Sequence, residues 1–225
     1  MQPLPPLVPG ELADGDFLKL IGRPDPVILD IGCNDGAEID RFLKMFPKCQ
    51  VHAFEPDPRP RARFKKHIRD KRVKLWPLAI SAQDGEAEFH LSSADQAPTG
   101  VQMPEGGEWD LSGSLRKPAK HLDFHPWVKF DKTMKVETMR LDTFTQRNRI
   151  TRIDFIWADV QGAEADLIAG ATESLKFTRY VYTEYNENEM YQGQVGLRKL
   201  IELLPEFEVV VRFPDDVLLR NRSFR

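Results

Sequence analysis

Two carboxylates flank a short glycine loop near the start of the chain. The segment runs from Val27 to Gly36 and contains Asp30, Gly32 and Asp35. Its glycines follow a Gly-x-x-x-Gly spacing, which matches neither the dinucleotide-binding loop nor the P-loop. A phosphate-binding loop also avoids nearby anions. The pattern therefore favours a cationic ligand, since a carboxylate attracts an ammonium or sulfonium group by about 4 kcal/mol at roughly 4 Å, before desolvation.

An acidic residue also ends the next predicted strand. Glu55 closes the apolar run 51–55, about 20 residues beyond the loop, where an acid can bind both hydroxyls of a ribose. S-adenosylmethionine (SAM) combines a ribose with an ammonium and a sulfonium, whereas the charge pattern of NAD differs. The sequence therefore predicts SAM as cofactor and S-adenosylhomocysteine as product. The predicted contacts include apolar residues beside the adenine and comprise Asp30, Gly32, Cys33, Asn34, Gly36, Glu55, Pro56, Ala79 and Ile80.

A further carboxylate, Asp159, follows the apolar run that starts at Ile153, and with Val160 it is predicted to border the cofactor. Methyl transfer requires an acceptor oxygen aligned with the S–CH3 bond, and a hydroxyl acceptor must also lose its proton. Asp159 is our first candidate for that base, provided that burial raises its pKa from about 3.9. Glu184, at the next strand end, and His121 are further catalytic candidates. They do not complete a ligand set for Mg²⁺, so no metal site is expected.

Short apolar runs alternate with amphipathic segments along the chain. Such alternation indicates an α/β fold with a largely parallel sheet covered on both faces, which brings the carboxyl ends of the strands to one edge. The predicted strands are 27–30, 51–55, 73–80, 86–91, 153–160 and 180–185, followed by a hairpin of 207–213 and 217–219. The predicted helices are 37–46, 59–68, 163–175 and 195–204.

Two segments interrupt this alternation. Residues 1–25 begin with four prolines among the first nine residues, so we expect an extended, proline-rich arm. Residues 94–132 are rich in Pro and Gly and lack a clear periodicity, and connections of this length are usually functional or mobile. We therefore expect a single domain over 26–225, in which the insertion at 94–132 covers the active site and recognises the acceptor.

The composition excludes several classes of protein. With 41% hydrophobic residues, 30% charged residues and a net charge of −3, the 225-residue chain resembles an ordinary globular protein and has no general attraction to nucleic acid or anionic membranes. No apolar run reaches the roughly 18 residues of a membrane span, and no secretory signal is recognisable. Cys33 and Cys49 cannot form a disulfide framework, which favours a cytoplasmic protein. The sequence does not indicate an oligomeric state.

One basic segment keeps an alternative open. Residues 59–74 are rich in Arg and Lys, with Asp70 as their acid, which suggests RNA methylation. A single-stranded RNA site would need aromatic residues interleaved with the cations. Here Phe64 and Ile68 fall on one helical face and the cations on the other. The pattern therefore favours a solvated helix face, and nucleic acid is the less favoured partner.

The ordered motifs resemble the FkbM-type methyltransferases from about Val27 to Tyr185. The resemblance implies a SAM-dependent O-methyltransferase with a class I, Rossmann-like three-layer sandwich. Its seven-stranded sheet would be mostly parallel, with an antiparallel strand in the C-terminal hairpin. Members of this family methylate hydroxyls of sugars, glycans and secondary metabolites. The matching blocks are Val27–Gly36, Val51–Pro58, Arg140–Phe144 and Ile153–Glu164.

The last block departs from the usual family pattern at two positions. It commonly reads Ile-Lys-Ile-Asp-Val-Glu-Gly, whereas this chain has Trp157 in place of the Lys and Gln161 in place of the Glu. Relative to the family pattern, one cationic and one anionic side chain are therefore missing together. This suggests that the two changes compensate each other in charge and that the acceptor is unusual. The same two residues keep open a second hypothesis, a module that binds SAM without turnover.

Overall fold

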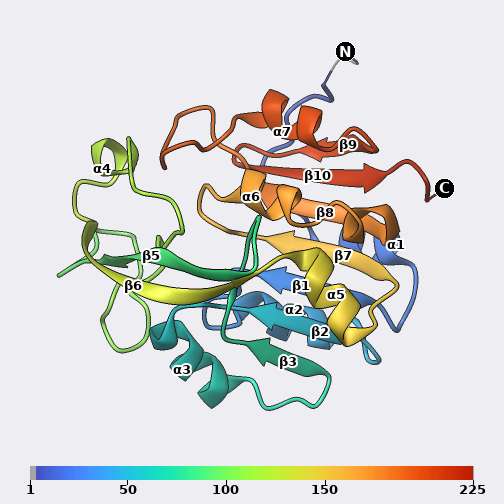
Figure 1. Ribbon diagram of the computed structural model, residues 1–225, viewed down its shortest axis with the longest axis horizontal. Coiled ribbons are helices and arrows are strands. Elements are labelled where there is room, and N and C mark those ends of the chain that lie inside the picture. Colours follow the sequence, from blue (N-terminus) through green and yellow to red (C-terminus); the bar gives the residue numbers. More distant parts are fainter. Residues whose placement is uncertain (1–3, 225) are drawn as a thin grey trace.

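The central sheet contains seven strands within residues 4–224, the part of the chain that the computed structural model describes (Figure 1). Its order is β3-β2-β1-β7-β8-β10-β9, and within residues 4–224 β10 alone runs opposite to the other six strands. This confirms the predicted parallel sheet with an antiparallel C-terminal strand. The strands are β1 (Val27–Ile31), β2 (Gln50–Phe54), β3 (Val73–Trp76), β7 (Ile153–Ala158), β8 (Thr178–Glu184), β9 (Phe207–Arg212) and β10 (Asp216–Asn221).

Alternating side chains of the strands bury two separate cores, one on each face of the sheet. In β1, Ile28 packs with Phe17 and Phe42 in one core, and the next residue, Leu29, packs with Phe144 in the other. This period of two is what a strand covered on both faces requires, and it confirms the three-layer sandwich. One face carries α1 (Asp14–Ile21), α2 (Ala37–Met45) and α3 (Pro58–His67); the other carries α5 (Leu141–Asn148), α6 (Glu164–Ala169) and α7 (Leu197–Leu203).

The predicted strand 73–80 is wrong, because it is divided between two sheets. After β3 the chain turns at Pro77, which has no N–H group to continue the ladder. The next strand, β4 (Ala79–Ile80), pairs with β6 (Lys129–Met139). A three-stranded sheet results, of order β4-β6-β5, with β5 covering Gly85–Ser93.

The strand β6 was not predicted, because its many charged residues hide the alternation of a strand. Its residues pair with those of β5 over most of their length, and Ser93 faces Lys129 at the open end. Residues 94–128 therefore form the irregular β5–β6 connection, which includes the short helix α4 (His121–Phe124). The strands β1, β2 and β3 point toward the side of the molecule where β5, β6 and α4 lie (Figure 1).

The predicted helix 163–175 is also interrupted. Helix α6 ends at Ala169, and a short 3-10 helix, η1 (Ser174–Phe177), follows. The backbone N–H groups of Glu173 and Ser174 both donate to the carboxylate of Asp142, at 3.0 and 2.8 Å. These bonds to a side chain replace the bonds that would continue α6, after a glycine with weak helix propensity at position 170.

The arm expected over residues 1–25 includes α1. Phe17 is fully buried and its ring lies 4.4 Å from that of Phe155 and 5.6 Å from that of Phe42, measured between centroids. Leu7 forms an isolated bridge with β9, while the first three residues of the expected arm lie outside the described residues. The segment therefore packs onto the sheet. Within residues 4–224, no helix combines the length and apolar character needed to cross a bilayer.

Candidate active site

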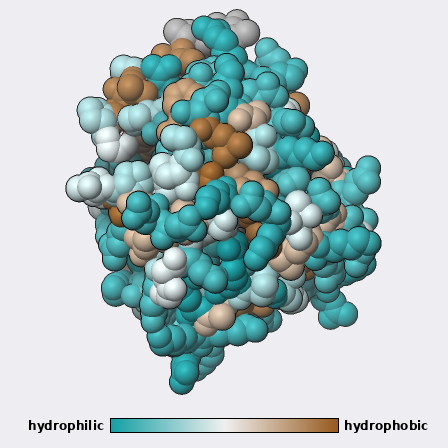
Figure 2. Space-filling model, turned by 90° about the vertical axis from the view of Figure 1, so that its left-hand side faces the viewer, coloured by the Kyte–Doolittle hydropathy of each residue, from teal (hydrophilic) through white to brown (hydrophobic). Residues whose placement is uncertain are grey.

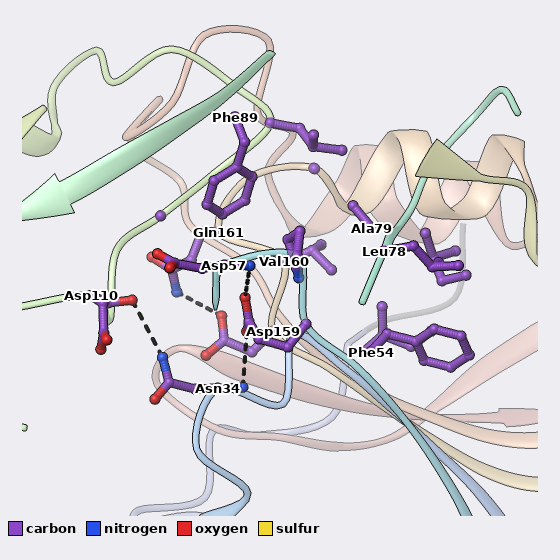
Figure 3. A pocket seen from close by; sticks show the side chains of 18 of the residues that line it. Asn34, Phe54, Asp57, Leu78, Ala79, Phe89, Asp110, Asp159, Val160 and Gln161 are labelled. Carbon is purple, nitrogen blue, oxygen red and sulfur yellow. Dashed lines mark hydrogen bonds between the residues drawn. The ribbon is translucent and has the colours of Figure 1, made fainter. Parts of the chain in front are cut away.

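A cavity of about 240 Å³ opens where the carboxyl ends of β1, β2 and β7 meet β4 and the β5–β6 connection (Figure 3). Its walls come from segments far apart in the sequence. The residues that line it are Ile31, Gly32, Asn34, Phe54, Glu55, Pro56, Asp57, Leu78, Ala79, Ile80, Phe89, Asp110, Leu111, Gly113, Leu115, Asp159, Val160, Gln161 and Ala163.

The glycine loop is held between the ends of two neighbouring strands. The N–H groups of Gly32 and Cys33 both donate to the carbonyl oxygen of Phe54, at 2.9 and 3.0 Å. Gly32 has a φ of 86°, and a Cβ there would lie 1.8 Å from the carbonyl oxygen of Asp159. Only glycine allows this approach, which brings the loop and Asp159 to the same cavity.

Glu55 accepts hydrogen bonds from two loops at once. One carboxyl oxygen accepts from the N–H of Asn34 at 3.0 Å, and the other from the N–H of Asp57 at 2.7 Å. Asn34 has a φ of 45°, so its N–H reaches Glu55 from a left-handed turn. Burial raises the pKa of Glu55 to about 8. Since the residue lines the cavity, its free lone pairs remain available to a ligand with hydroxyl groups.

The polar part of the cavity is acidic. Four carboxyl groups, Glu55, Asp57, Asp110 and Asp159, line it, and within residues 4–224 no Lys, Arg or His does so. Apolar residues from β2 and β4 form the opposite part of the wall, with Phe54 and Leu78 among them (Figure 3). An apolar wall facing carboxylates suits SAM, whose adenine is apolar and whose amino-acid end carries an ammonium beside the sulfonium. The residues present therefore fit the predicted cofactor.

Asp159 lies at the end of β7, beside a second carboxyl group. The side-chain nitrogen of Gln161 donates to Asp159 at 2.6 Å (Figure 3) and to Glu184 at 3.2 Å. Burial raises the pKa of Asp159. The pKa of Glu184 is well above its ordinary value, first because of burial and then because of the charge of Asp159. A base for a hydroxyl needs a pKa raised in this way.

Eight of the predicted site residues line the cavity: Gly32, Asn34, Glu55, Pro56, Ala79, Ile80, Asp159 and Val160. Five do not, namely Asp30, Cys33, Gly36, Glu184 and His121. Cys33 packs into the core under α2, and Gly36 adopts a φ of 88° at the start of that helix. Both therefore shape the loop from behind the cavity.

Asp30 lies on the face of β1 that is turned toward α2. It pairs in register with Trp157 of β7 and is 2% exposed. One of its carboxyl oxygens has no hydrogen-bond partner within residues 4–224, and burial, with Glu38 next, raises its pKa well above the ordinary value. Trp157 packs 4.3 Å from Tyr182, between ring centroids, so the position that commonly carries Lys in the family here completes an aromatic core.

His121, in α4, is buried against Tyr191, whose ring centroid lies 5.4 Å away. Burial lowers its pKa to about 4, with His125 as a smaller cause. The residue is therefore neutral at physiological pH. It reaches Gln161 only through Tyr191, whose hydroxyl lies 2.8 Å from the side-chain oxygen of Gln161.

The β5–β6 connection supplies cavity residues that the sequence did not predict: Asp110, Leu111, Gly113 and Leu115. Asp110 forms a two-pronged ion pair with Arg63 of α3, with contacts of 2.7 and 2.8 Å. Its carbonyl oxygen accepts from the side chain of Asn34 at 3.3 Å. No local sequence signal marks Asp110, because its partners lie on distant segments.

The same contacts explain the basic helix α3. Arg59 pairs with Asp57, Arg63 with Asp110, and Lys66 with Glu105 of the β5–β6 connection. These cations anchor neighbouring segments, which weakens the case for RNA. Figure 2 looks onto this side of the molecule and shows a mostly hydrophilic surface with separate apolar patches. Within residues 4–224, no group of three or more His, Cys, Asp or Glu residues could hold a metal ion.

The raised pKa values predict that the free protein loses stability in mild alkali. Glu55, with a pKa of about 8, and Glu164, with a pKa of about 7, bind protons in the folded state that they release when unfolded, at about 4.3. Raising the pH from about 7 to about 8.5 should therefore lower the free energy of unfolding by about 1–2 kcal/mol. Chemical denaturation at the two pH values measures this, and Glu55→Gln should flatten the dependence. Equal stability at the two pH values would contradict the raised pKa values of Glu55 and Glu164.

The chain is similar to known proteins over most of its length. A model of the "Methyltransferase FkbM domain" matches residues 30–215. The chain is 48% identical, over 210 residues, to the 2-O-methyltransferase NoeI of Sinorhizobium fredii (strain NBRC 101917 / NGR234). The aligned region covers 91% of this chain and 83% of that protein.

Solved structures resemble the chain more distantly. The N-terminal domain of EvdMO1 with S-adenosylhomocysteine bound has a TM-score of 0.47 and 10% identity, covering 93% of this chain and 79% of that one. A SAM-dependent methyltransferase from Aquifex aeolicus has a TM-score of 0.46 and 11% identity, covering 92% and 88%. Both are too distant to support a conclusion by themselves. The family model and the similarity to NoeI place the chain in the FkbM family of SAM-dependent methyltransferases.

Proposed function

We propose that the enzyme transfers the methyl group of SAM to a hydroxyl of a sugar, a glycan or a secondary metabolite. The observation that carries this proposal is the position of Asp159, a carboxyl group with a raised pKa in the same cavity as the glycine loop and Glu55. The relative named as a 2-O-methyltransferase suggests that the acceptor position is a 2-hydroxyl.

Each part of the cavity has a role in this proposal. SAM supplies an electrophilic methyl group on its sulfonium. Glu55 accepts hydrogen bonds from the ribose hydroxyls, Gly32 leaves room for the amino-acid end, and Ala79 and Ile80 flank the adenine. Asp159 orients the acceptor hydroxyl and receives its proton as the new O–C bond forms. These roles use residues from four strand ends that the fold brings together.

The β5–β6 connection is our candidate for acceptor recognition. It lies over the cavity, and its exposed apolar residues include Leu111, Leu122 and Phe124. In this proposal, residues 26–225 act as one catalytic domain and the connection is its substrate-reading part. Cys33 and Cys49 are free, buried thiols, which suits an enzyme that works in the reducing cytoplasm.

An acceptor screen tests the proposed reaction. The protein is incubated with SAM and pairs of glycosides that differ only in the presence of the 2-hydroxyl, and S-adenosylhomocysteine and methylated sugar are followed by mass spectrometry. We expect product from at least one parent glycoside and none from its 2-deoxy partner. If SAM binds but no hydroxylated acceptor is methylated, the proposal is wrong and the module without turnover becomes the better description.

Replacing Glu55 should weaken cofactor binding. Glu55→Ala removes the partner of two backbone N–H groups and of the ribose, so SAM affinity should fall by about 1–3 kcal/mol. Titration calorimetry measures this, with Glu137→Ala as control, because Glu137 is exposed on β6. An affinity equal to that of the unmodified protein would remove Glu55 from the ribose site.

A further inference from the structure

Gln161 stands between two carboxyl groups. Its side-chain nitrogen lies 2.6 Å from Oδ1 of Asp159 and 3.2 Å from Oε2 of Glu184. Both carboxyl groups therefore crowd around one amide group. The backbone of Gln161 has a φ of 49°, a left-handed conformation that costs energy in a residue other than glycine. The turn directs the side chain of Gln161 back toward Asp159 at the end of β7. The backbone conformation therefore determines where the amide lies.

The orientation of the amide follows from Asp159, at 2.6 Å, and agrees with the position of Tyr191. The hydroxyl of Tyr191 lies 2.8 Å from Oε1 of Gln161 and 3.0 Å from the carbonyl oxygen of Ser112. An ionised carboxylate can only accept hydrogen bonds, and the hydroxyl can donate to the amide oxygen. The amide must therefore turn its NH2 group toward the acids. Gly162 allows the ring to come this close, since a Cβ there would lie 2.7 Å from Tyr191.

Three further acids on other elements interact with Asp159. Asp159 raises the pKa of Asp30 on β1, of Glu164 on α6 and of Asp216 on β10, after burial in each case. Two carboxyl groups that share one donor in such surroundings cannot both ionise at moderate pH, because like charges repel strongly out of water. A Glu at position 161, which is common in the family, would add another anion beside Asp159 and Glu184 and so increase this repulsion.

We propose that Asp159 and Glu184 hold one proton between them, carried by Glu184, and that Gln161 is the positioning residue that keeps the ionised carboxylate on the cavity side. Two observations support this placement of the charge. The amide N–H contact is shorter to Asp159 than to Glu184, and Asp159 lines the cavity whereas Glu184 does not. The stronger hydrogen bond from the amide favours the ionised form of Asp159. Its position on the cavity wall places that charge where a ligand would meet it.

The consequence for catalysis rests on the proposed O-methylation. As the acceptor oxygen bonds to the methyl carbon, the bond between that carbon and the sulfonium sulfur breaks and its electron pair stays on the sulfur. The O–H bond of the acceptor breaks, and its proton moves to the ionised oxygen of Asp159. It then passes to water, which restores the singly charged pair. In this proposal Gln161 acts on the reaction through Asp159, because its own amide neither gives nor takes a proton in the transfer. Its effect should therefore appear in the pH dependence rather than in substrate binding.

Carboxyl ¹³C NMR of the free protein, labelled in Asp and Glu, tests the shared proton without an acceptor. Asp159→Asn and Glu184→Gln assign the two signals. We expect Asp159 to ionise first and Glu184 to titrate after it, well above the ordinary range of a glutamate. Gln161→Leu, which removes the donor, should raise the Asp159 midpoint by about one pH unit. Tyr191→Phe, which frees the amide, should shift it in the same direction by less.

A matched control separates this effect from a general change of charge. Gln161→Glu places a third acid at the pair and should raise both midpoints, whereas Gln146→Glu adds the same charge at an exposed position of α5 and should leave them unchanged. Ordinary midpoints near 4 for both carboxyl groups, or an Asp159 midpoint that ignores Gln161→Leu and Tyr191→Phe, would overturn the proposal. Normal titration shifts without any methylated acceptor would instead reject only the proposed reaction.

Discussion

Gly32→Ala should cost the protein more than about 4 kcal/mol of its free energy of unfolding and abolish SAM binding. The added Cβ would lie 1.8 Å from the carbonyl oxygen of Asp159 and 2.8 Å from its carbonyl carbon. Both are main-chain atoms of a strand end, so no side-chain rotation relieves the clash. The φ of 86° adds strain, because alanine avoids the left-handed region.

Thermal unfolding measures this loss, and the melting temperature should fall by about 10 °C or more. Gly15→Ala is the matched control. A Cβ at Gly15 would have no neighbour within 4 Å, and its helix should gain about 0.5–1 kcal/mol. If Gly32→Ala melts like the unmodified protein and still binds SAM, the loop does not approach Asp159 as closely as described.

Asp159→Asn should reduce turnover by about 10²–10⁴-fold while SAM still binds. The substitution preserves the shape of the side chain and an oxygen that can accept from Gln161, but it removes the group that receives the acceptor's proton. The loss should therefore appear in kcat. The KM for SAM should change little, because Gly32, Glu55 and the apolar wall contribute most of the predicted cofactor contacts.

Steady-state kinetics with an acceptor from the glycoside screen measures the two parameters separately. Asp166→Asn offers a control on the neighbouring helix, since Asp166 pairs with Arg116 and does not line the cavity. Equal kcat values for Asp159→Asn and the unmodified enzyme would exclude Asp159 as the base. A large rise in the KM for SAM would instead assign it to cofactor binding.

Local patterns predicted the part of the site that lies at strand ends. Gly32, Glu55 and Asp159 each follow an apolar run, and parallel strands bring such ends together whatever the rest of the chain does. The same reasoning misplaced Asp30. Successive residues of a strand face opposite sides of a sheet, and Asp30 falls on the side of α2, away from the cavity.

The remaining site residues depend on contacts over long sequence distances. Arg63 and Asp110 lie 47 positions apart, and Gln161 and Tyr191 lie 30 apart. No periodicity relates such pairs, so their partnership arises only from the tertiary fold. The strand β6 was missed for a similar reason. Most residues of β6 are exposed, and many of them are Lys or Glu. Its pairing with β5 holds the strand in place, so its sequence does not need a regular alternation of apolar and polar residues.

The pairing of Ser93 with Lys129 has a consequence for how acceptor preference can change. Because these residues face each other across a hairpin, the loop they enclose begins and ends at one place. Its length can vary at a small entropic cost, and the sheet need not move. The loop is thus an exchangeable segment, constrained where it contacts the rest of the site: Asp110 pairs with Arg63, and the carbonyl oxygen of Ser112 accepts from Tyr191. If the connection recognises the acceptor as proposed, related enzymes could acquire new acceptors by changing the parts of this loop that do not line the cavity.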